Sequence, residues 1–561
     1  MHAWTESRSI AICGAVLIGA GAIAYSDSFR GPFVFDDLLS IPQNPSLHRL
    51  FALWRVLSPP DDGATVSGRP IVNLTLALNT AAGGNTVWGY HLVNLAIHLL
   101  AGLTLFGLTR RTIERWRPQA IPGGFGTSAK LLALAISALW TLHPLQTESV
   151  TYIVQRAESL MGLFYLQTLY CFIRGNETRK RIWFILSWLA CFLGMATKEV
   201  MASAPVIVLL YDRTFVAGSL GEAWRRRRGY YAALSGTWLL LAVLIIGTSN
   251  RGGTAGFGLP VSVGRYWLAE TVAIIRYLRL AVWPHPLVFD YYVQWFDFWP
   301  AFPFALAVAF LLAATLWLLA HAPAAGFLGI WFFAILAPTS LVPGIRQTMA
   351  EHRMYVALVP IMVLAVMGAH RIAGRRALPA FVAAAIVLGF LTFRRNLDYR
   401  TSISLWGDTV QKLPSNPCAH DNLSAAFFSA RNFPSARREA EEAIRLKADA
   451  SSSHCNLANA LLSLGDTAGA IRQYATAIRL NPGDTVSHFN LGVAYYETGR
   501  APAAVIEYLA ALSLDPNYSP ARINLAQTLR RLRLAAAPQL HADPAPPISR
   551  PPAPAHRPST P

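Results

Sequence analysis

The chain has 561 residues, of which 53% are hydrophobic and only 14% are charged, and its mean hydropathy is +0.36. Soluble proteins carry about a quarter charged residues, so this composition excludes an ordinary soluble protein and indicates that a bilayer surrounds much of the chain. The net charge is +18, but the arginines cluster between apolar segments, which is typical of cytoplasmic loops and excludes a nucleic-acid-binding surface as the first interpretation.

Eleven apolar segments approach the ~20 residues that a helix needs to cross the hydrocarbon layer. They lie at residues 9–26, 88–108, 130–146, 150–172, 182–197, 199–212, 231–248, 301–320, 325–342, 354–370 and 377–393. A twelfth segment, 265–283, is interrupted by Glu270, Arg276 and Arg279, so we expect a re-entrant or interfacial helix there. The first segment resembles a cleavable signal, but the many spans that follow favour a retained anchor.

The arginine-rich loops set the expected orientation. Such loops occur at residues 110–117, 174–181, 225–228 and 371–376. Cytoplasmic loops are enriched in Lys and Arg, and these four agree with one another if eleven segments cross and the N-terminus lies inside. The segment 28–87, the loops near 147 and 344–353, and everything after residue 394 are then expected outside the cytoplasm.

A 34-residue period replaces the long apolar segments from residue 415 onward. AsnLeu recurs at 422–423, 456–457, 490–491 and 524–525; alanine recurs in phase at 426, 460 and 494 and at 436, 470 and 504; and Pro482 and Pro516 end repeats. A helix-turn-helix unit of this length, with small residues at the helix crossing, is typical of tetratricopeptide repeats (TPRs).

These patterns predict an all-α protein with two domains and a tail. Residues 1–400 are expected to form a polytopic helical bundle, and residues 401–535 a TPR α-solenoid of about three repeats plus partial repeats. Residues 536–561 are rich in proline and alanine, and they are expected to form a flexible tail because they cannot bury enough apolar surface.

Asp36 and Asp37 are the first candidates for chemistry, because they follow the first span among aromatic residues. A carboxylate in partly dry surroundings has a raised pKa, which suits a general base, and it can also hold a cation. A solvated turn acid or a helix N-cap fits the pair equally well. A divalent cation is therefore open, but two adjacent aspartates without further spaced ligands do not specify one.

Further polar residues are expected at the same outer boundary. They are Arg69, His91, His143, Glu148, Arg156, Lys198, Glu351, His352 and Arg353. Each of them alone fits interhelical hydrogen bonding, but together they combine acids with cationic donors. This mixture suits an anionic lipid phosphate held next to a carboxylate that deprotonates an acceptor. The sequence contains no P-loop, GxSxG or HExxH motif and no Rossmann fingerprint in its strand context, so soluble nucleotide-driven chemistry is not expected.

The order of several motifs resembles the TMTC family, the transmembrane and TPR-containing protein O-mannosyltransferases with the GT-C membrane fold. The motifs are FVFDD, GRP, GYHLVNLAIH, HPLQTESV, RAESL, TKE and EHRMY, and they span most of residues 30–400. The resemblance implies a polyprenyl-phosphate-linked mannose as donor and Ser or Thr hydroxyls outside the cytosol as acceptors. The arginine- and alanine-rich composition suggests a bacterial inner membrane.

The resemblance also implies roles for individual residues. Asp36 would be the general base, and Asp37 would assist it or orient the acceptor. The set listed above would bind the donor phosphate and sugar: Arg156, Lys198 and Arg353 suit the phosphate, and Glu148 and His352 suit sugar or acceptor contacts. One base is enough for a single inverting displacement at the anomeric carbon.

Two other functions fit the same sequence. The sugar acceptor could be a lipid or polysaccharide, or the chain could be a non-catalytic, membrane-anchored TPR scaffold. The TPR groove is expected to bind an acceptor or partner peptide. The recurring asparagines are candidates for that contact, although they fit helix-stabilising repeat positions equally well; they are Asn422, Asn456, Asn490 and Asn524.

Overall fold

The computed structural model describes residues 2–48, 50–60, 64–120, 129–248, 256–345 and 347–536. These residues form helices and loops, and no β-strand occurs among them, which confirms the all-α class. They divide into two compact units, with the boundary between Thr401 and Ser402. The predicted tail lies outside the described residues, except for Ala536 at its start.

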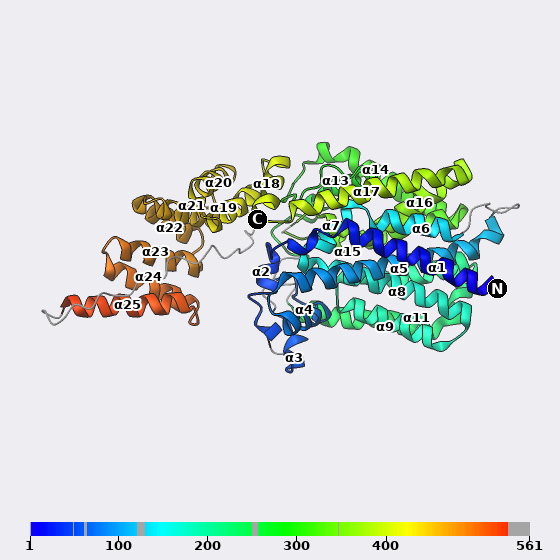
Figure 1. Cartoon of the computed structure of the whole chain (residues 1–561), viewed down its shortest axis with the longest axis horizontal. Coiled ribbons are helices and arrows are strands. Elements are labelled where there is room, and N and C mark those ends of the chain that lie inside the picture. The colour runs from blue at the N-terminus through cyan, green and yellow to red at the C-terminus, as the bar shows by residue number, and fades with distance from the viewer. Residues whose placement is uncertain are drawn as a thin grey trace. The chain divides into compact units, whose positions relative to one another are not determined.

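The first unit consists of long apolar helices that run roughly side by side (Figure 1). In chain order they are α1 (His2–Ala24), α5 (Val87–Ala120), α6 (Ala129–Thr141), α8 (Arg156–Thr178), α9 (Arg181–Met195), α10 (Ala204–Asp212), the π-helix η6 (Arg213–Ala217), α11 (Leu220–Gly247), α13 (Val263–Val282), α14 (Phe298–His321), α15 (Pro323–Leu341), α16 (Met354–Ala373), η8 (Gly374–Arg376) and α17 (Ala377–Asp398).

Seven of the described helical stretches are long and apolar enough to cross a membrane. They contain eight of the eleven predicted spans, because the last stretch, Glu351–Asp398, holds both α16 and α17. The other three predicted spans correspond to α6 and α9, with 13 and 15 residues, and to α8, which carries charges near both ends. Helix α13, which covers most of the interrupted segment 265–283, is not one of the seven.

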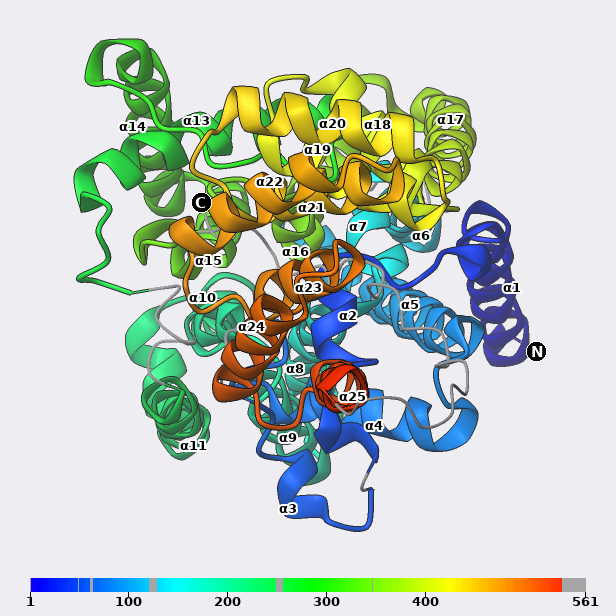
Figure 2. The same ribbon diagram turned by 90° about the vertical axis from the view of Figure 1, so that its left-hand side faces the viewer.

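Short helices connect the long ones at the end of this unit that lies opposite the N-terminus. Figure 1 shows α2, α3 and α4 at that end, and Figure 2 views the long helices more nearly end-on. The short elements are η1 (Ser28–Arg30), α2 (Asp36–Ser40), η2 (Pro45–His48), α3 (Leu53–Val56), α4 (Pro70–Gly83), η3 (Pro144–Gln146), α7 (Thr147–Thr151), η4 (Ile153–Gln155), η5 (Glu199–Ser203) and η7 (Glu351–Arg353). Loops at helix ends are where side chains for a site are most easily gathered.

Small residues allow the central helices to approach closely. A Cβ atom added at Gly162 of α8 would lie 2.5 Å from the ring of Tyr355 in α16, which is closer than packed atoms tolerate. Tyr355 is completely buried and its hydroxyl lies 2.9 Å from Nδ1 of His98 in α5. The close approach at Gly162 fixes α16, and therefore η7 before it, against α8. The His98 contact fixes α16 against α5.

Polar contacts also join neighbouring long helices at the end of the bundle that lies away from α2, α3 and α4. Arg111 near the end of α5 forms an ion pair with Glu177 at the end of α8. Arg227 of α11 lies 2.8 Å from the buried carboxylate of Asp212 at the end of α10. The hydroxyls of Thr112 in α5 and Tyr211 in α10 lie 2.8 Å apart, so three of the predicted cytoplasmic loops belong to one end of the bundle.

The second unit is a row of helix pairs. The helices are α18 (Ser402–Lys412), α19 (Pro417–Ser429), α20 (Phe433–Leu446), α21 (Ser451–Ser463), α22 (Thr467–Leu480), α23 (Thr485–Glu497), α24 (Ala501–Leu514) and α25 (Ser519–Ala536). The recurring alanines Ala436, Ala470 and Ala504 are completely buried where paired helices cross. The predicted helix-turn-helix repeat is confirmed, with Pro482 and Pro516 just after the ends of α22 and α24.

Candidate functional site

Asp37 is a buried connection between two loops. It is completely inaccessible, and its two carboxylate oxygens accept the backbone N–H of Val34 at 3.0 Å and of Val154 at 2.7 Å. Burial raises the pKa of Asp37 to about 8, and the two backbone hydrogen bonds oppose the shift. The contacts of Asp37 therefore hold the start of α2 against η4.

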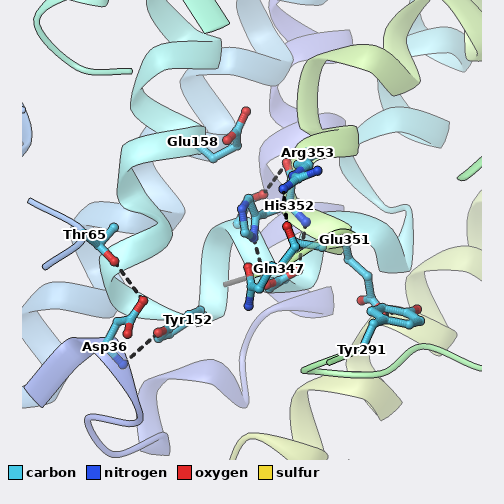
Figure 3. A network of polar contacts seen from close by, with 12 residues as sticks. Asp36, Thr65, Tyr152, Glu158, Tyr291, Gln347, Glu351, His352 and Arg353 are labelled. Atoms are coloured by element: carbon cyan, nitrogen blue, oxygen red, sulfur yellow. Dashed lines mark hydrogen bonds and ion pairs between the residues drawn. The ribbon is translucent and has the colours of Figure 1, made fainter. Parts of the chain in front are cut away.

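Asp36 is the partly exposed member of the pair. Its backbone N–H donates to the hydroxyl of Tyr152 at 2.9 Å, and its carboxylate accepts the hydroxyl of Thr65 at 2.9 Å (Figure 3). The preceding residue, Phe35, has a φ of 49°, a conformation that non-glycine residues rarely adopt outside constrained sites. Asp36 is thus a positioned carboxylate that solvent or a ligand can reach.

Two cationic side chains lie next in this network. Arg69, at the start of α4, donates to the backbone carbonyl of Thr65 at 2.7 Å and lies 3.5 Å from Glu199. The ammonium of Lys198, the residue before Glu199, lies 2.5 Å from a carboxylate oxygen of Glu158. Burial lowers the pKa of Lys198, and the Glu158 carboxylate opposes that shift.

Glu148 and His352 form a two-point contact between α7 and η7. The backbone N–H of His352 donates to one oxygen of Glu148 at 2.8 Å, and Nδ1 of its ring lies 2.8 Å from the other oxygen. An ionised Glu148 accepts a proton shared from Nδ1, whereas a protonated Glu148 donates to it. Burial raises the pKa of Glu148, and the backbone hydrogen bond from His352 opposes the shift.

The neighbours of His352 bind the loops around α13. Glu351 accepts the backbone N–H of Val288 at 2.6 Å and the hydroxyl of Tyr291 at 2.8 Å. Arg353 pairs with Glu270 of α13 at 3.2 Å (Figure 3 shows the η7 side chains). One of the three charges that interrupt segment 265–283, Glu270, is therefore the partner of a predicted site residue.

Three other predicted site residues form hydrogen bonds to other parts of the bundle. Each guanidinium nitrogen of Arg156 donates to a protein acceptor, with Asn94 and Asn79 both at 2.6 Å. His91 contacts the carbonyl of Gly31 at 3.0 Å. His143 contacts the carbonyl of Ala281 at 3.1 Å through Nε2 and accepts the backbone N–H of Leu145 through Nδ1. These contacts favour the interhelical interpretation of all three residues.

The repeat asparagines lie inside the second unit. Asn456 donates to the carboxylate of Asp421 in the preceding repeat at 2.9 Å, and Asn490 donates to Asn459 at 3.0 Å. Asn422 donates to the carbonyl of Cys418 one turn earlier, and Asn524 is completely buried. These positions favour repeat stabilisation over direct peptide contact.

Several members of the network are not among the residues predicted from sequence. They are Thr65, Tyr152, Glu158, Glu270, Tyr291 and Arg395. Glu158 and Glu270 had a detectable signal, because each is an acid within an otherwise apolar segment. Thr65, Tyr152 and Tyr291 have no such signal, since uncharged hydroxyl side chains are common in loops.

The acidic pair does not resemble a metal site. Among the described residues, no group of three or more His, Cys, Asp or Glu side chains is placed to hold a metal ion. Both oxygens of Asp37 are engaged by backbone N–H groups, so the pair offers only Asp36 to a cation. We derive no step through a metal.

Comparisons with known proteins agree with both halves of this description. A family model described as tetratricopeptide repeat matches residues 422–485 and 455–519. Protein O-mannosyl-transferase TMTC2 of Homo sapiens is 28% identical over 34% of this chain and 23% of its own length. TMTC2 of Xenopus laevis is 30% identical over 34% and 23%, and Tmtc1 of Drosophila melanogaster is 30% identical over 35% and 23%.

The matched region is thus about a third of this chain and under a quarter of each of these relatives. Among solved structures, the APC/C hetero-tetramer Cut9–Hcn1 gives a TM-score of 0.25 at 13% identity, over 82% of this chain and 90% of that chain, which is too low to compare folds. The sequence matches confirm the resemblance that the ordered motifs indicate: over about a third of its length this chain is similar to the TMTC protein O-mannosyl-transferases, and its C-terminal unit contains tetratricopeptide repeats.

Proposed function

We propose that this chain is a membrane glycosyltransferase that moves a sugar, with mannose as the first candidate, from a polyprenyl-phosphate donor to Ser or Thr hydroxyls of a protein. The names of its relatives support the activity. The observation that carries the proposal is the continuous network from the accessible carboxylate of Asp36 through Thr65 to Arg69. A base next to fixed cations is what transfer from a lipid phosphate requires.

The reaction is a single displacement. The acceptor hydroxyl gives its proton to the carboxylate of Asp36 as its oxygen bonds to the anomeric carbon. The bond between that carbon and the phosphate oxygen breaks, and its electron pair leaves with the polyprenyl phosphate. Attack opposite the leaving group inverts the anomeric configuration and needs no second carboxylate as nucleophile.

Arg69 and Lys198 are the cations best placed to stabilise the phosphate. Their present partners, Glu199 and Glu158, are carboxylates at 3.5 and 2.5 Å, so an anionic ligand competes with or adds to existing ion pairs. Fixed cations in a dry site stabilise a developing charge much more strongly than water does. Arg156 and Arg353 hold helices and loops in place around them.

We propose that the helical bundle lies in a bacterial inner membrane. The site and the TPR unit then lie on its non-cytoplasmic side. Helix α5 begins near the network and carries the arginine-rich segment 110–117 in its last part. Helix α8 begins at Arg156 and ends at Thr178, inside the basic segment 174–181. The basic loops and the network therefore belong to opposite ends of the bundle, and the positive-inside rule assigns the basic end to the cytoplasm. The TPR unit is proposed to bind the acceptor or a partner protein.

The first test is the transfer of radiolabelled mannose from polyprenyl-phosphate-mannose in membranes that contain wild type, Asp36→Asn or Asp297→Asn. Asp297 is an exposed aspartate whose side chain does not cap α14, so its variant controls for the substitution itself. We expect Asp36→Asn to lose roughly 10²- to 10⁴-fold in rate, the contribution of a general base, at equal expression and thermal stability.

The state of the label separates the alternatives. Label that proteases release supports a protein acceptor, whereas label that organic solvent extracts, or that stays in protease-resistant polysaccharide, shows the other acceptor classes. Equal transfer by wild type and Asp36→Asn refutes the role of Asp36. No transfer of any sugar tested favours the TPR scaffold.

A further inference from the structure

The site contains a buried carboxylate with one unused oxygen: Lys198 pairs with Oε2 of Glu158, and Oε1 has no hydrogen-bond partner among the described residues. Glu158 is completely buried in the first turn of α8. Apart from the ion pair with Lys198, neither of its oxygens accepts a hydrogen bond from a described residue. A carboxylate offers about four acceptor positions, and buried acceptors are normally satisfied because leaving them empty is costly. Glu158 is therefore suited to donors that come from outside the chain.

A second acceptor lies beside it. Nδ1 of His352 lies 2.8 Å from Glu148, and in the tautomer that donates to this carboxylate, Nε2 of the neutral ring is a lone-pair acceptor. No hydrogen bond from a described residue reaches Nε2. Lys198, Glu158, Arg353 and Arg69 are the charged groups that act on this ring, and the three cations among them favour the neutral form.

These acceptors are connected to the proposed base and phosphate site. Glu158 pairs with Lys198, whose neighbour Glu199 contacts Arg69, and Arg69 contacts Thr65, which donates to Asp36. Figure 3 shows Glu158 nearer to the His352 and Arg353 side of the network than to Asp36. A donor molecule whose phosphate pairs with Lys198 brings its sugar close to Glu158, the present partner of that cation.

We infer that Glu158, together with Nε2 of His352, forms the subsite that accepts hydrogen bonds from the hydroxyls of the transferred hexose. The inference rests on the proposed function and identifies what selects the sugar. The unused oxygen of Glu158 and Nε2 of His352 match a ligand rich in hydroxyl donors. A subsite of this kind also rejects sugars that lack the recognised hydroxyl, because its buried acceptors would then stay empty.

The experiment measures dissociation constants of the full-length enzyme in detergent for three kinds of ligand. They are polyprenyl-phosphate-mannose, a set of analogues that each lack one sugar hydroxyl, and polyprenyl phosphate without sugar. The variants are Glu158→Gln, Glu158→Asp and, as a control, Glu114→Gln, whose exposed carboxylate pairs with Arg110 near the opposite end of α5. Wild type should bind at least one deoxy analogue roughly 10- to 100-fold more weakly than the complete donor.

Glu158→Gln should lose that discrimination without weaker binding of polyprenyl phosphate, because the substitution removes the carboxylate that pairs with Lys198. Equal weakening for the sugar donor and the bare lipid phosphate would show that Glu158 acts only through Lys198, and would overturn the inference. So would a wild type that binds every deoxy analogue as well as mannose, a result that does not depend on any variant folding. A wild type that binds no lipid-linked sugar better than polyprenyl phosphate would instead overturn the proposed function, and this subsite with it.

Discussion

Adjacent residues of the same type have different tasks in this site. Asp36 presents a carboxylate that solvent can reach, whereas Asp37 is buried and bonded to the backbone at Val34 and Val154. The difference follows from helical geometry, because consecutive residues at the start of α2 point in directions about 100° apart. The composition of the pair predicts a site, but only its surroundings separate the candidate base from the structural residue.

The raised pKa of Asp37 predicts a pH-dependent stability. Its pKa is raised to about 8 in the folded protein, against roughly 3.9 in an unfolded chain. The folded state then holds the proton more tightly, so Asp37 contributes less stability as pH rises from about 4 to about 8. Asp37→Asn does not titrate, and the melting temperature of wild type should therefore fall relative to that variant over this range.

Thermal unfolding of the two proteins in detergent between pH 5 and 8 checks the expectation, with Asp297→Asn as the control. If wild type instead gains on Asp37→Asn as pH rises, the two backbone N–H groups outweigh burial, and the carboxylate is ionised in the fold.

The positions of the helices follow much more directly from apolar composition and from the 34-residue period than the contacts of the site do. The apolar segments correspond to helices, and the 34-residue period places each repeat. The contacts of the site escape such patterns, because Glu148 and His352 are 204 residues apart and no local spacing encodes their pairing. Arg156 shows the limit of a single signal: a charge in an apolar segment indicates function, its guanidinium also bonds to Asn79 and Asn94, and its role in the site stays a prediction.

The approach of α8 to α16 can be tested at Gly162. An added methyl group would overlap the ring of Tyr355, so Gly162→Ala should destabilise the bundle by about 1–3 kcal/mol and shift η7, which carries His352. Gly236→Ala in α11 is the control, since no atom lies within 4 Å of the added Cβ. Melting temperatures in detergent provide the measurement. Equal stability of the two variants would show that α16 can move away without cost.

The repeat asparagines provide a test in the second unit. Asn490 is completely buried and donates to Asn459, so Asn490→Ala should lower the stability of the repeats by about 1–3 kcal/mol. Asn517→Ala changes an exposed asparagine in the turn before α25 and serves as the control. Chemical denaturation followed by circular dichroism measures both. Unchanged stability combined with weaker capture of an acceptor protein would restore the peptide-binding interpretation.

The whole molecule has a chemical polarity along its helices. The network from Asp36 to His352 lies where helices α5, α8 and α16 begin, and arginine-rich segments follow where they end. Neither end alone gives the orientation, but the ion pair between Arg111 and Glu177 shows that two of the basic segments lie together. A bundle with this polarity is expected to insert in one direction only.

Labelling with a membrane-impermeant maleimide tests that orientation in intact cells. We expect reaction at Asp297→Cys and Asn517→Cys without permeabilisation, and at Arg375→Cys only after it. The parent protein, which has five native cysteines, provides the background. Labelling of Arg375→Cys from outside would invert the molecule, whereas protection of Asn517→Cys alone would move the TPR unit to the cytoplasm and change the number of crossings.

The hydrogen bonds of Asp37 have a consequence for attempts to alter sugar preference. One of them joins Asp37, the residue beside the proposed base, to Val154. Glu158 follows Val154 by four residues in the same segment. Substitutions made to reshape that stretch for a new donor will displace Asp36 as well, so selectivity and turnover should be lost together in most variants of a mutant library. Successful redesign should therefore start from η7, on the other side of the proposed sugar subsite, because the η7 residues make no hydrogen bond to Asp37.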